Sequence, residues 1–513
     1  MDINKPNMIA HIAPLRRMPN SLPFLSYLLP TELEPRIQRG SMVLIPLRGQ
    51  DIPGLVLRLE TVSDVARLKP ISKYLGITLP EHSVLTLEKV AEYFASTLPY
   101  LTDALLPTPG KRWNEEIPPI ETRNTKFANE RRLIELNHAS EESTILRNLA
   151  DETIAAGSAM HVIVPSLEKA GLVADVFDGA YRVGIITSEV SPGKIWSVFI
   201  LALRGELDVL ITTRRGCLTP ISRLGRTVVL DEESSDHKQW DMKPRYDART
   251  VAMIKAETSG SGYIAISIAP RLTARQTLVS QTSLVTIPKI LVHVNPETKN
   301  PFSQPTLDAI EDALDIGKKV AVLDSSGFSV PVPGSNPARL PALASEASLV
   351  IILFPDRMLF TNEWSAEERM HAELLRLTKR MRSDATLIIV ATTAHRAFAG
   401  LLPGRRDEYF RKLIDERQEH NYPPFGSFIK LIVQSDKSLD DATQKAIALE
   451  ASLKSPGVEM LGPYPADPAM VRGRFRALAL LHGTPEAIRA VKAGLFNLPD
   501  EILVDIDPER IFR

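Results

Sequence analysis

The stretch TVVLDEE, Thr227–Glu233, is an apolar run that ends in three acidic residues. A short apolar run of this kind is typical of a buried strand of a parallel sheet. Acids at the end of such a strand hold the magnesium ion in a nucleotide-driven motor. The same pattern also describes an ordinary strand end in an α/β protein, so the two interpretations must be separated by the rest of the chain.

A phosphate-binding loop does not accompany this strand. A motor of this type needs the pattern G-x-x-x-x-G-K-[ST], whose backbone N–H groups and lysine hold the phosphates. The chain has three Gly-Lys pairs, beginning at Gly110, Gly193 and Gly317, and none is followed by Ser or Thr or preceded by the required glycine. The pattern as a whole therefore argues against a working motor.

The composition of the chain limits the classes of protein to which it can belong. With 513 residues and 44% hydrophobic content, the chain can form about three or four domains. The net charge of −1 gives no global footprint for nucleic acid, so any DNA contact must come from local patches. The single cysteine, Cys217, excludes an intrachain disulfide and a cysteine-rich zinc site, and is most simply a core residue of a cytoplasmic protein. No apolar stretch is long enough for a membrane span, and no membrane partner is expected.

Periodicity predicts a multidomain α/β fold. Strands and helices alternate from residue 129 to 415, whereas the first 65 residues alternate strands with turns and the last hundred follow a β-α-β-β-α-β order. The expected domains are a small β domain (1–65), a helical module (66–110), a linker (111–128), an α/β lobe (129–283), a shortened second lobe (284–415) and a split-βαβ domain (416–513).

Three local features of the sequence each predict a specific structure or binding site. Ser365 and Glu368 have the spacing of a capping box at the start of a helix. Arg472, Arg474 and Arg476 enter a strand, where alternation would place three guanidinium groups on one face, suited to a nucleic-acid backbone; a solvated edge strand is the alternative. The segment that follows the acidic strand contains both cations and aromatic rings, which suit phosphates and unpaired bases. The alternative is a packed loop with no DNA contact. The candidate residues of this segment are Lys238, Gln239, Trp240, Arg245, Tyr246 and Arg249.

Four blocks of sequence, in order, resemble the family of primosomal protein N′, the replication restart protein PriA. They are LSYLLPTELEPRIQRGSMVLIP (25–46), GELDVLITTRRGCLTPISRLGRTVVLDEESSDHKQWDMKPRYDART (205–250), NYPPFG (421–426), and LGPYP, RGRFR and VDIDP between residues 461 and 508. The resemblance implies a domain for the 3′ end of a DNA strand, a winged-helix module, two helicase-like (RecA-like) lobes and a C-terminal domain that binds DNA or partners. It also implies DNA contacts at Ser26, Tyr27 and Arg48.

The departures from the family are equally informative. NHASEEST (137–144) stands where the family carries its phosphate loop, and it keeps only the hydroxyl of Thr144. The family's DEEH reads Asp231-Glu232-Glu233-Ser234, its two zinc clusters are missing, and RLTKRMR (376–382) lacks the glycine turn that would place an arginine finger. In the N-terminal domain, the serine of Leu25-Ser26-Tyr27 replaces the family's aspartate.

The sequence therefore predicts a motor-less relative that recognises forked, branched or single-stranded DNA and organises single-strand-binding protein and primosome components. No cofactor and no zinc are expected. Two alternatives stay open. One is a residual ATP-dependent helicase in which Asp231 and Glu232 hold Mg²⁺, and the other is a protein-docking module without a DNA role.

Overall fold

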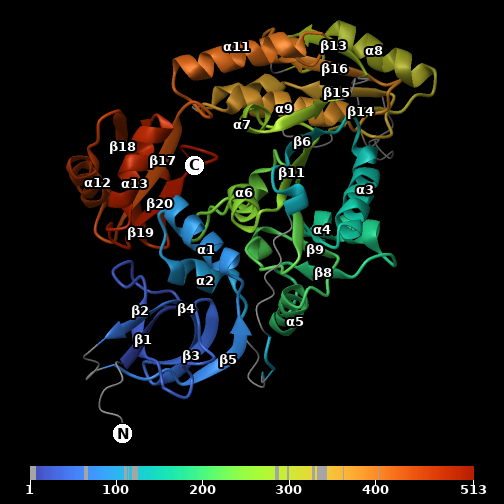
Figure 1. Cartoon of the computed structure of the whole chain (residues 1–513). Coiled ribbons are helices and arrows are strands. Elements are labelled where there is room, and N and C mark those ends of the chain that lie inside the picture. Colours follow the sequence, from blue (N-terminus) through green and yellow to red (C-terminus); the bar gives the residue numbers. More distant parts are fainter. Residues whose placement is uncertain are drawn as a thin grey trace.

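The protein is described by a computed structural model that covers residues 7–62, 68–108, 113, 115–117, 125–282, 288–296, 300–325, 330–331, 344–361, 363–402 and 404–512. Four sheets are found in these residues. Figure 1 shows the N-terminal sheet in blue at the bottom, the larger α/β lobe in green beside and above it, the second lobe at the top, and the C-terminal domain in red at the left.

The N-terminal domain is a five-stranded antiparallel sheet in the order β2-β1-β4-β3-β5. Its turn at Arg48 and Gly49 has φ angles of 50° and 81°, as a two-residue hairpin with the right-handed twist of its strands requires. The bounds are β1 (Asn7–Pro14), β2 (Leu25–Leu28), β3 (Ser41–Leu47), β4 (Gln50–Val62) and β5 (Lys73–Thr78), followed by α1 (Glu81–Tyr93) and α2 (Leu98–Leu105). Because β5 pairs with β3, the first sheet continues past the domain boundary expected at residue 65.

The larger lobe, lobe 1, has a seven-stranded parallel sheet in the order β12-β6-β11-β10-β7-β9-β8. Residues 227–230, the apolar part of TVVLDEE, end its central strand β10, in which every residue is buried. The strands are β6 (Arg131–Glu135), β7 (Ala159–Ile163), β8 (Val183–Ile186), β9 (Val209–Thr212), β10 (Leu224–Leu230), β11 (Gly262–Ser267) and β12 (Val279–Thr282); the helices are α3 (Glu142–Ala155), α4 (Leu167–Phe177), α5 (Pro192–Leu203), α6 (Ala248–Ser259) and α7 (Leu272–Thr277).

The second lobe, lobe 2, has a four-stranded parallel sheet in the order β13-β16-β15-β14. Its strands are β13 (Lys289–Val294), β14 (Val320–Leu323), β15 (Leu349–Leu353) and β16 (Thr386–Ala391); its helices are α8 (Gln304–Asp315), α9 (Ala366–Thr378), α10 (Arg396–Ala399) and α11 (Arg406–Glu419). Helix α9 begins where the sequence predicts, but the capping box is not formed, because Ser365 makes no side-chain cap bond and Glu368 bonds elsewhere.

The C-terminal domain has the predicted split-βαβ order. Its elements are β17 (Ser427–Ser435), α12 (Leu439–Leu453), β18 (Val458–Val471), β19 (Arg474–Gly483), α13 (Pro485–Leu495) and β20 (Ile502–Ile506). The strand order is β18-β19-β17-β20, so β19 separates the two strands joined by α12, as this arrangement requires.

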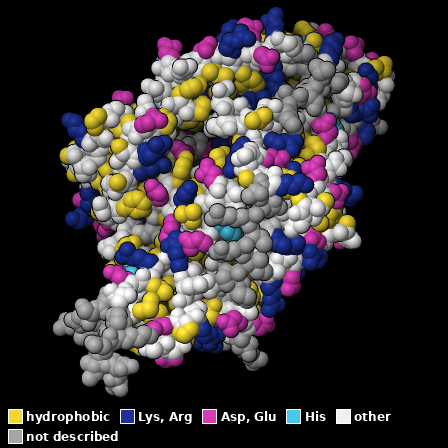
Figure 2. Space-filling model, in the orientation of Figure 1, with side chains coloured by type: hydrophobic (Ala, Val, Ile, Leu, Met, Phe, Trp, Pro, Cys, Tyr) yellow, Lys and Arg dark blue, Asp and Glu magenta, His cyan; other side chains and the backbone are white. Residues whose placement is uncertain are grey.

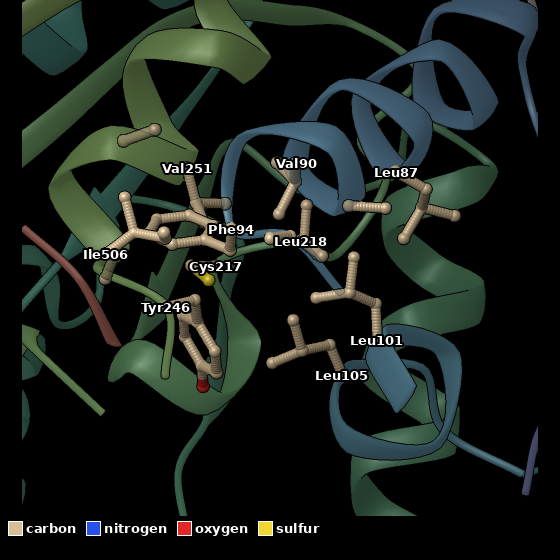
Figure 3. Close-up of a cluster of buried hydrophobic side chains, with 14 of the residues drawn as sticks. Leu87, Val90, Phe94, Leu101, Leu105, Cys217, Leu218, Tyr246, Val251 and Ile506 are labelled. Carbon is tan, nitrogen blue, oxygen red and sulfur yellow. The ribbon is translucent and has the colours of Figure 1, made fainter. Parts of the chain in front are cut away.

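The N-terminal helices are fixed to lobe 1 by one continuous core. Figure 3 shows Leu87 and Val90 of α1, Phe94 directly after that helix, and Leu101 and Leu105 of α2. They face Cys217, Leu218, Tyr246 and Val251 of lobe 1 and Ile506 of β20. Cys217 is fully buried there, as predicted for a core residue. Most of the predicted linker lies outside the described residues, but Trp113 packs edge-on against Trp196 of α5 at 5.3 Å.

Candidate nucleic-acid interface

The position expected for nucleotide phosphates holds an internal ion pair. Lys169, at the start of α4, places its Nζ 2.7 Å from Glu142 and 3.3 Å from Asp231. Burial raises the pKa of Glu142, although Lys169 opposes this shift. Thr144 is exposed on α3. Two acids and no glycine turn face this position, so its residues do not fit a triphosphate with Mg²⁺.

The other two acids of the DEE motif also have internal partners. Glu232 is buried and pairs with Arg271 at 2.7 Å. Glu233 accepts a hydrogen bond from Ser267 and pairs at 3.3 Å with Arg376, which comes from α9 of lobe 2. The acids at the end of β10 therefore fix neighbouring elements, and one of them bridges the two lobes.

The lobe contact is strengthened by a buried lysine. Lys379, which ends α9, has a side chain that is 0% exposed and lies 2.7 Å from Glu135 of β6. Its Nζ also donates to the backbone carbonyls of Leu136 and Ile268, at 2.8 Å each. The basic cluster RLTKRMR therefore contributes contacts to lobe 1, in addition to the helix-end position that its sequence predicts.

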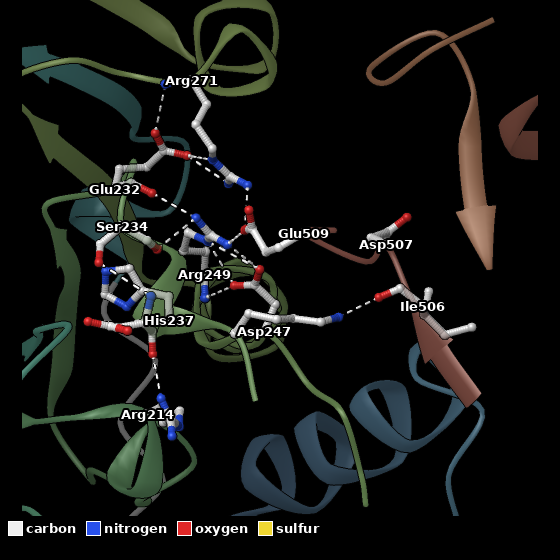
Figure 4. Close-up of polar contacts among 12 residues, drawn as sticks. Arg214, Glu232, Ser234, His237, Asp247, Arg249, Arg271, Ile506, Asp507 and Glu509 are labelled. Atoms are coloured by element: carbon white, nitrogen blue, oxygen red, sulfur yellow. Dashed lines mark hydrogen bonds and ion pairs between the residues drawn. The ribbon is translucent and has the colours of Figure 1, made fainter. Parts of the chain in front are cut away.

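The loop that follows the acidic strand is mostly packed rather than open. Lys238 pairs with Asp505 at 3.0 Å and donates to the carbonyl of Ile506 in β20, and Arg245 pairs with the same aspartate at 3.2 Å. In Figure 4, Arg249 lies among Asp247, Glu509 and the backbone of Glu232. Arg249 lowers the pKa of Asp247 despite the opposing effect of burial. These cations join lobe 1 to the C-terminal domain, and in this arrangement they are not available to DNA.

Part of the same loop lines a cleft of about 560 Å³ between the N-terminal segment and lobe 1. Gln239 and Tyr246 contribute to its wall, although Tyr246 is otherwise part of the core. The cationic side chains of the cleft are Arg17, Arg214, Arg215 and Lys243, against the acids Asp103 and Asp241. Trp240, next to Gln239 in sequence, is 66% exposed. A basic cleft beside an exposed indole suits a single strand with unstacked bases.

The N-terminal candidates divide into one structural residue and two accessible ones. Tyr27 is buried and donates to the carbonyl of Pro46 at 3.2 Å; burial raises its pKa. Arg48 is exposed at the tip of the β3–β4 hairpin. Ser26 is half-buried on β2, with its Oγ 3.0 Å from Nδ1 of His11.

The three arginines of RGRFR do not share a strand face. Arg472 and Gly473 form the turn between β18 and β19, with φ angles of 51° and 76°. Arg474 is exposed and bonds Gln434 at 3.3 Å, whereas Arg476 is buried and donates to the carbonyl of Pro468. Arg472 does not share a face with the other two because the strand begins only at Arg474.

Several polar residues near these candidates did not emerge from the sequence. His11 and Glu60 lie beside Ser26, and Arg214 and Arg215 follow β9 at the cleft. Two adjacent arginines one residue after a strand of the parallel sheet were a usable signal, since loops at that edge of a sheet form binding sites. The His11 contact is between strands, and a single sequence carries no signal for it.

The face of the molecule seen in Figure 2 has no single continuous basic patch among the residues that the structure describes. In the view of Figure 2, basic and acidic side chains are interspersed over all the domains visible there. This agrees with the net charge of −1. Nucleic-acid binding would therefore depend on local sites such as the cleft.

Two parallel α/β lobes, with a β domain before them and a split-βαβ domain after them, define a multidomain α/β protein. Residues 18–107 match the model of the PriA "3'DNA-binding domain (3'BD)". Residues 418–509 match that of the "Primosomal protein N C-terminal domain". Both matched segments are therefore similar to domains of the replication restart protein PriA family.

Curated relatives agree with this family. The replication restart protein PriA of Rickettsia felis is 23% identical over 346 residues, which are 60% of this chain and 52% of that protein. The one from Chlamydia trachomatis is 28% identical over 172 residues, which are 30% of this chain and 23% of that protein. The chain thus spans about half the length of the Rickettsia relative.

Solved structures are more distant. A structure of RecG bound to a three-way DNA junction has a TM-score of 0.37 and 11% identity, covering 83% of this chain and 74% of that one. Among the helices that the structure describes, none is long and apolar enough to cross a membrane.

Proposed function

We propose that this protein binds forked or branched DNA in replication restart and organises primosome components there without unwinding the DNA. The proposal is supported by the match of residues 18–107 to a 3′ DNA-binding domain and by relatives named as replication restart proteins. The observation that carries it is the bridge of Lys169 between Glu142 and Asp231, because it stands where a motor of this family would hold nucleotide.

In this proposal, DNA contacts the candidate residues whose side chains are accessible at the surface. We place a strand end at the N-terminal domain near Ser26 and Arg48, and the adjoining single strand in the basic cleft at Arg214, Arg215 and Trp240. The exposed turn that carries Arg472, and Arg474 after it, would give a further backbone contact in the C-terminal domain. Single-strand-binding protein and primosome components are the protein partners that we propose for that domain.

The test is fluorescence anisotropy of a fork with an annealed leading strand, compared with plain duplex and single strand, over a salt series without nucleotide. We expect the fork to be preferred at least tenfold, about 1.4 kcal/mol, with an affinity that falls as salt rises because phosphate contacts release counterions. Equal or undetectable binding of the three DNAs would refute fork recognition and leave protein docking as the better account.

A further inference from the structure

A buried lysine lies behind the loop that carries two arginines of the cleft. This loop connects β9 to β10 and presents Arg214 and Arg215 to the cleft. Lys255 of α6 is 4% exposed, and its Nζ lies 2.6 Å from the carbonyl oxygen of Thr219 and 3.5 Å from that of Cys217. Both carbonyls belong to the same loop, a few residues after the arginines, so the amine holds the loop from its buried side.

The third contact of Lys255 is a histidine and not a carboxylate. Nδ1 of His161, on β7, lies 3.0 Å from Nζ, and Nε2 of the same ring lies 2.9 Å from the hydroxyl of Thr212. Among the residues that the structure describes, no carboxylate pairs with Lys255. Because burial without a counter-ion disfavours a charge, it lowers the pKa of Lys255 to about 7.

The charged form of Lys255 matches its surroundings better than the neutral form. An ammonium has three N–H donors and no acceptor, and it is surrounded by three acceptors, the two loop carbonyls and Nδ1 of His161. The imidazole then carries its hydrogen on Nε2 and donates it to Thr212. A neutral amine has only two N–H donors, so loss of the proton leaves one acceptor unbonded. The carbonyl of Cys217, at 3.5 Å, has the weakest of the three contacts.

The other titratable groups around Lys255 keep one charge state near neutral pH. Burial, together with the charge of Lys255, lowers the pKa of His161 well below its ordinary value. Burial also raises the pKa of the Cys217 thiol to about 12 and that of Tyr246 well above its ordinary value. Despite burial, a paired arginine holds the pKa of Asp247, at the start of α6, below its ordinary value. Of these groups, Lys255 alone changes charge near pH 7.

We propose that Lys255 is a positioning residue for DNA binding, and that the protonation state of the buried Lys255–His161 pair controls how firmly the cleft presents Arg214 and Arg215 to a DNA strand. The inference rests on the proposed function, which places single-stranded DNA in this cleft. With the ammonium in place, the loop is held at both carbonyls and the arginines meet the phosphates in one arrangement. After the proton is lost, the DNA itself must order the loop, and this cost reduces the affinity.

The test measures fork binding by anisotropy at about pH 6 and about pH 8.5, at constant salt. We expect the unchanged protein to bind at least about threefold more tightly at the lower pH. Arg215→Ala should remove most of this difference, because the side chain that the loop presents is absent. Arg474→Ala is the matched control, since it removes an exposed arginine that we place at the DNA in another domain. It should weaken binding at both pH values and leave their ratio unchanged.

A comparison with stability separates this role from a purely structural one. The folded pKa of Lys255, about 7, lies below its ordinary value of 10.5. The unfolded chain therefore binds more protons between these values, and the free energy of unfolding should rise with pH above about 7. The DNA affinity should fall over the same range, opposite to stability. Lys255→Met should remove both contributions, whereas Lys255→Arg, which stays charged, should keep the tighter binding at the higher pH.

The outcomes distinguish the two proposals. Failure to bind the fork at either pH would overturn the proposed function. Fork binding with a ratio near one between the two pH values, or with the same ratio in Arg215→Ala, would overturn this inference and leave the proposed function standing. The Arg215 comparison changes an exposed side chain, so it decides the question even if Lys255→Met does not fold.

Discussion

At the residue scale, Glu135 shows how this chain joins its lobes. The carboxylate ends β6 of lobe 1 and is 1% exposed, yet three cations surround it: Arg275 at 2.6 Å, Lys379 at 2.7 Å, and Arg406. Although burial opposes ionisation, these cations hold the pKa of Glu135 at about 2. Two of them belong to lobe 2, so one side chain couples the two lobes.

Removing this charge should weaken the whole molecule. Glu135→Gln leaves buried cations without a counter-ion, a change that costs about 3–5 kcal/mol in comparable sites. We expect a loss of unfolding free energy of that size in urea titrations at neutral pH. Asp384→Asn is the control, because Asp384 pairs with Arg382 on the surface; its denaturation midpoint should be unchanged. An equal effect of both substitutions would contradict the buried-bridge account.

The same carboxylate predicts an acid dependence. Its folded pKa of about 2 lies below the ordinary value of 4.5. The stabilisation is therefore complete above about pH 4.5 and is lost as the pH falls toward 2. Urea titrations of the unchanged protein and of Glu135→Gln should differ most near neutral pH and converge in acid. A difference that grew as the pH fell would reverse the assigned sign.

At the element scale, helix α9 shows where local patterns lose to tertiary contacts. The sequence places the helix correctly, but Glu368 does not cap it. Instead Glu368 accepts from the backbone N–H of Leu272 in lobe 1 at 2.6 Å and pairs with the buried Arg417 of α11. A capping box is a local signal, and it cannot anticipate a donor that arrives from another domain.

Substitutions at Ser365 and Glu368 compare how much each residue contributes to stability. Ser365→Ala should change stability little, because the hydroxyl makes no cap bond. Glu368→Gln should cost at least about 2 kcal/mol, because it removes the partner of a buried guanidinium. Thermal and urea unfolding of the two variants would measure this. The reverse order would indicate that the capping box, and not the lobe contact, stabilises the helix.

The prediction of strands and loops from the sequence is limited in a similar way. The apolar runs locate the central strands of both lobes because buried strands need continuous apolar side chains. Strand β13 gives a weaker signal, because none of its residues is fully buried. The loop from Lys238 to Arg249 has the composition of a nucleic-acid site, yet its cations are neutralised by Asp505 and Glu509, residues about 260 positions away.

At the scale of the whole molecule, the multidomain α/β fold follows from the sequence, whereas the surroundings of the candidate site residues do not. Order and type of elements are local properties, and the four sheets reflect them. The cleft at Arg214 and Arg215 depends on how the N-terminal segment is placed against lobe 1. The contact between Ser26 and His11 likewise depends on the pairing of β1 with β2.

The arginines of the cleft predict an effect on the binding of every kind of DNA. Arg215→Ala should weaken binding of fork, duplex and single strand alike and reduce the salt slope by about one, as the loss of one phosphate contact does. Arg382→Ala is the matched control, since it removes an exposed arginine of lobe 2 that pairs with Asp384. Anisotropy over a salt series measures both. An unchanged slope for Arg215→Ala would place the DNA elsewhere.

The most direct test of the central claim is phosphate release and fork binding, measured together with and without ATP and Mg²⁺. If the bridge of Lys169 to Glu142 and Asp231 has replaced nucleotide binding, the fork affinity should be the same in both conditions and DNA should stimulate no hydrolysis. DNA-stimulated phosphate release that disappears in Asp231→Ala would contradict the account and identify a residual motor.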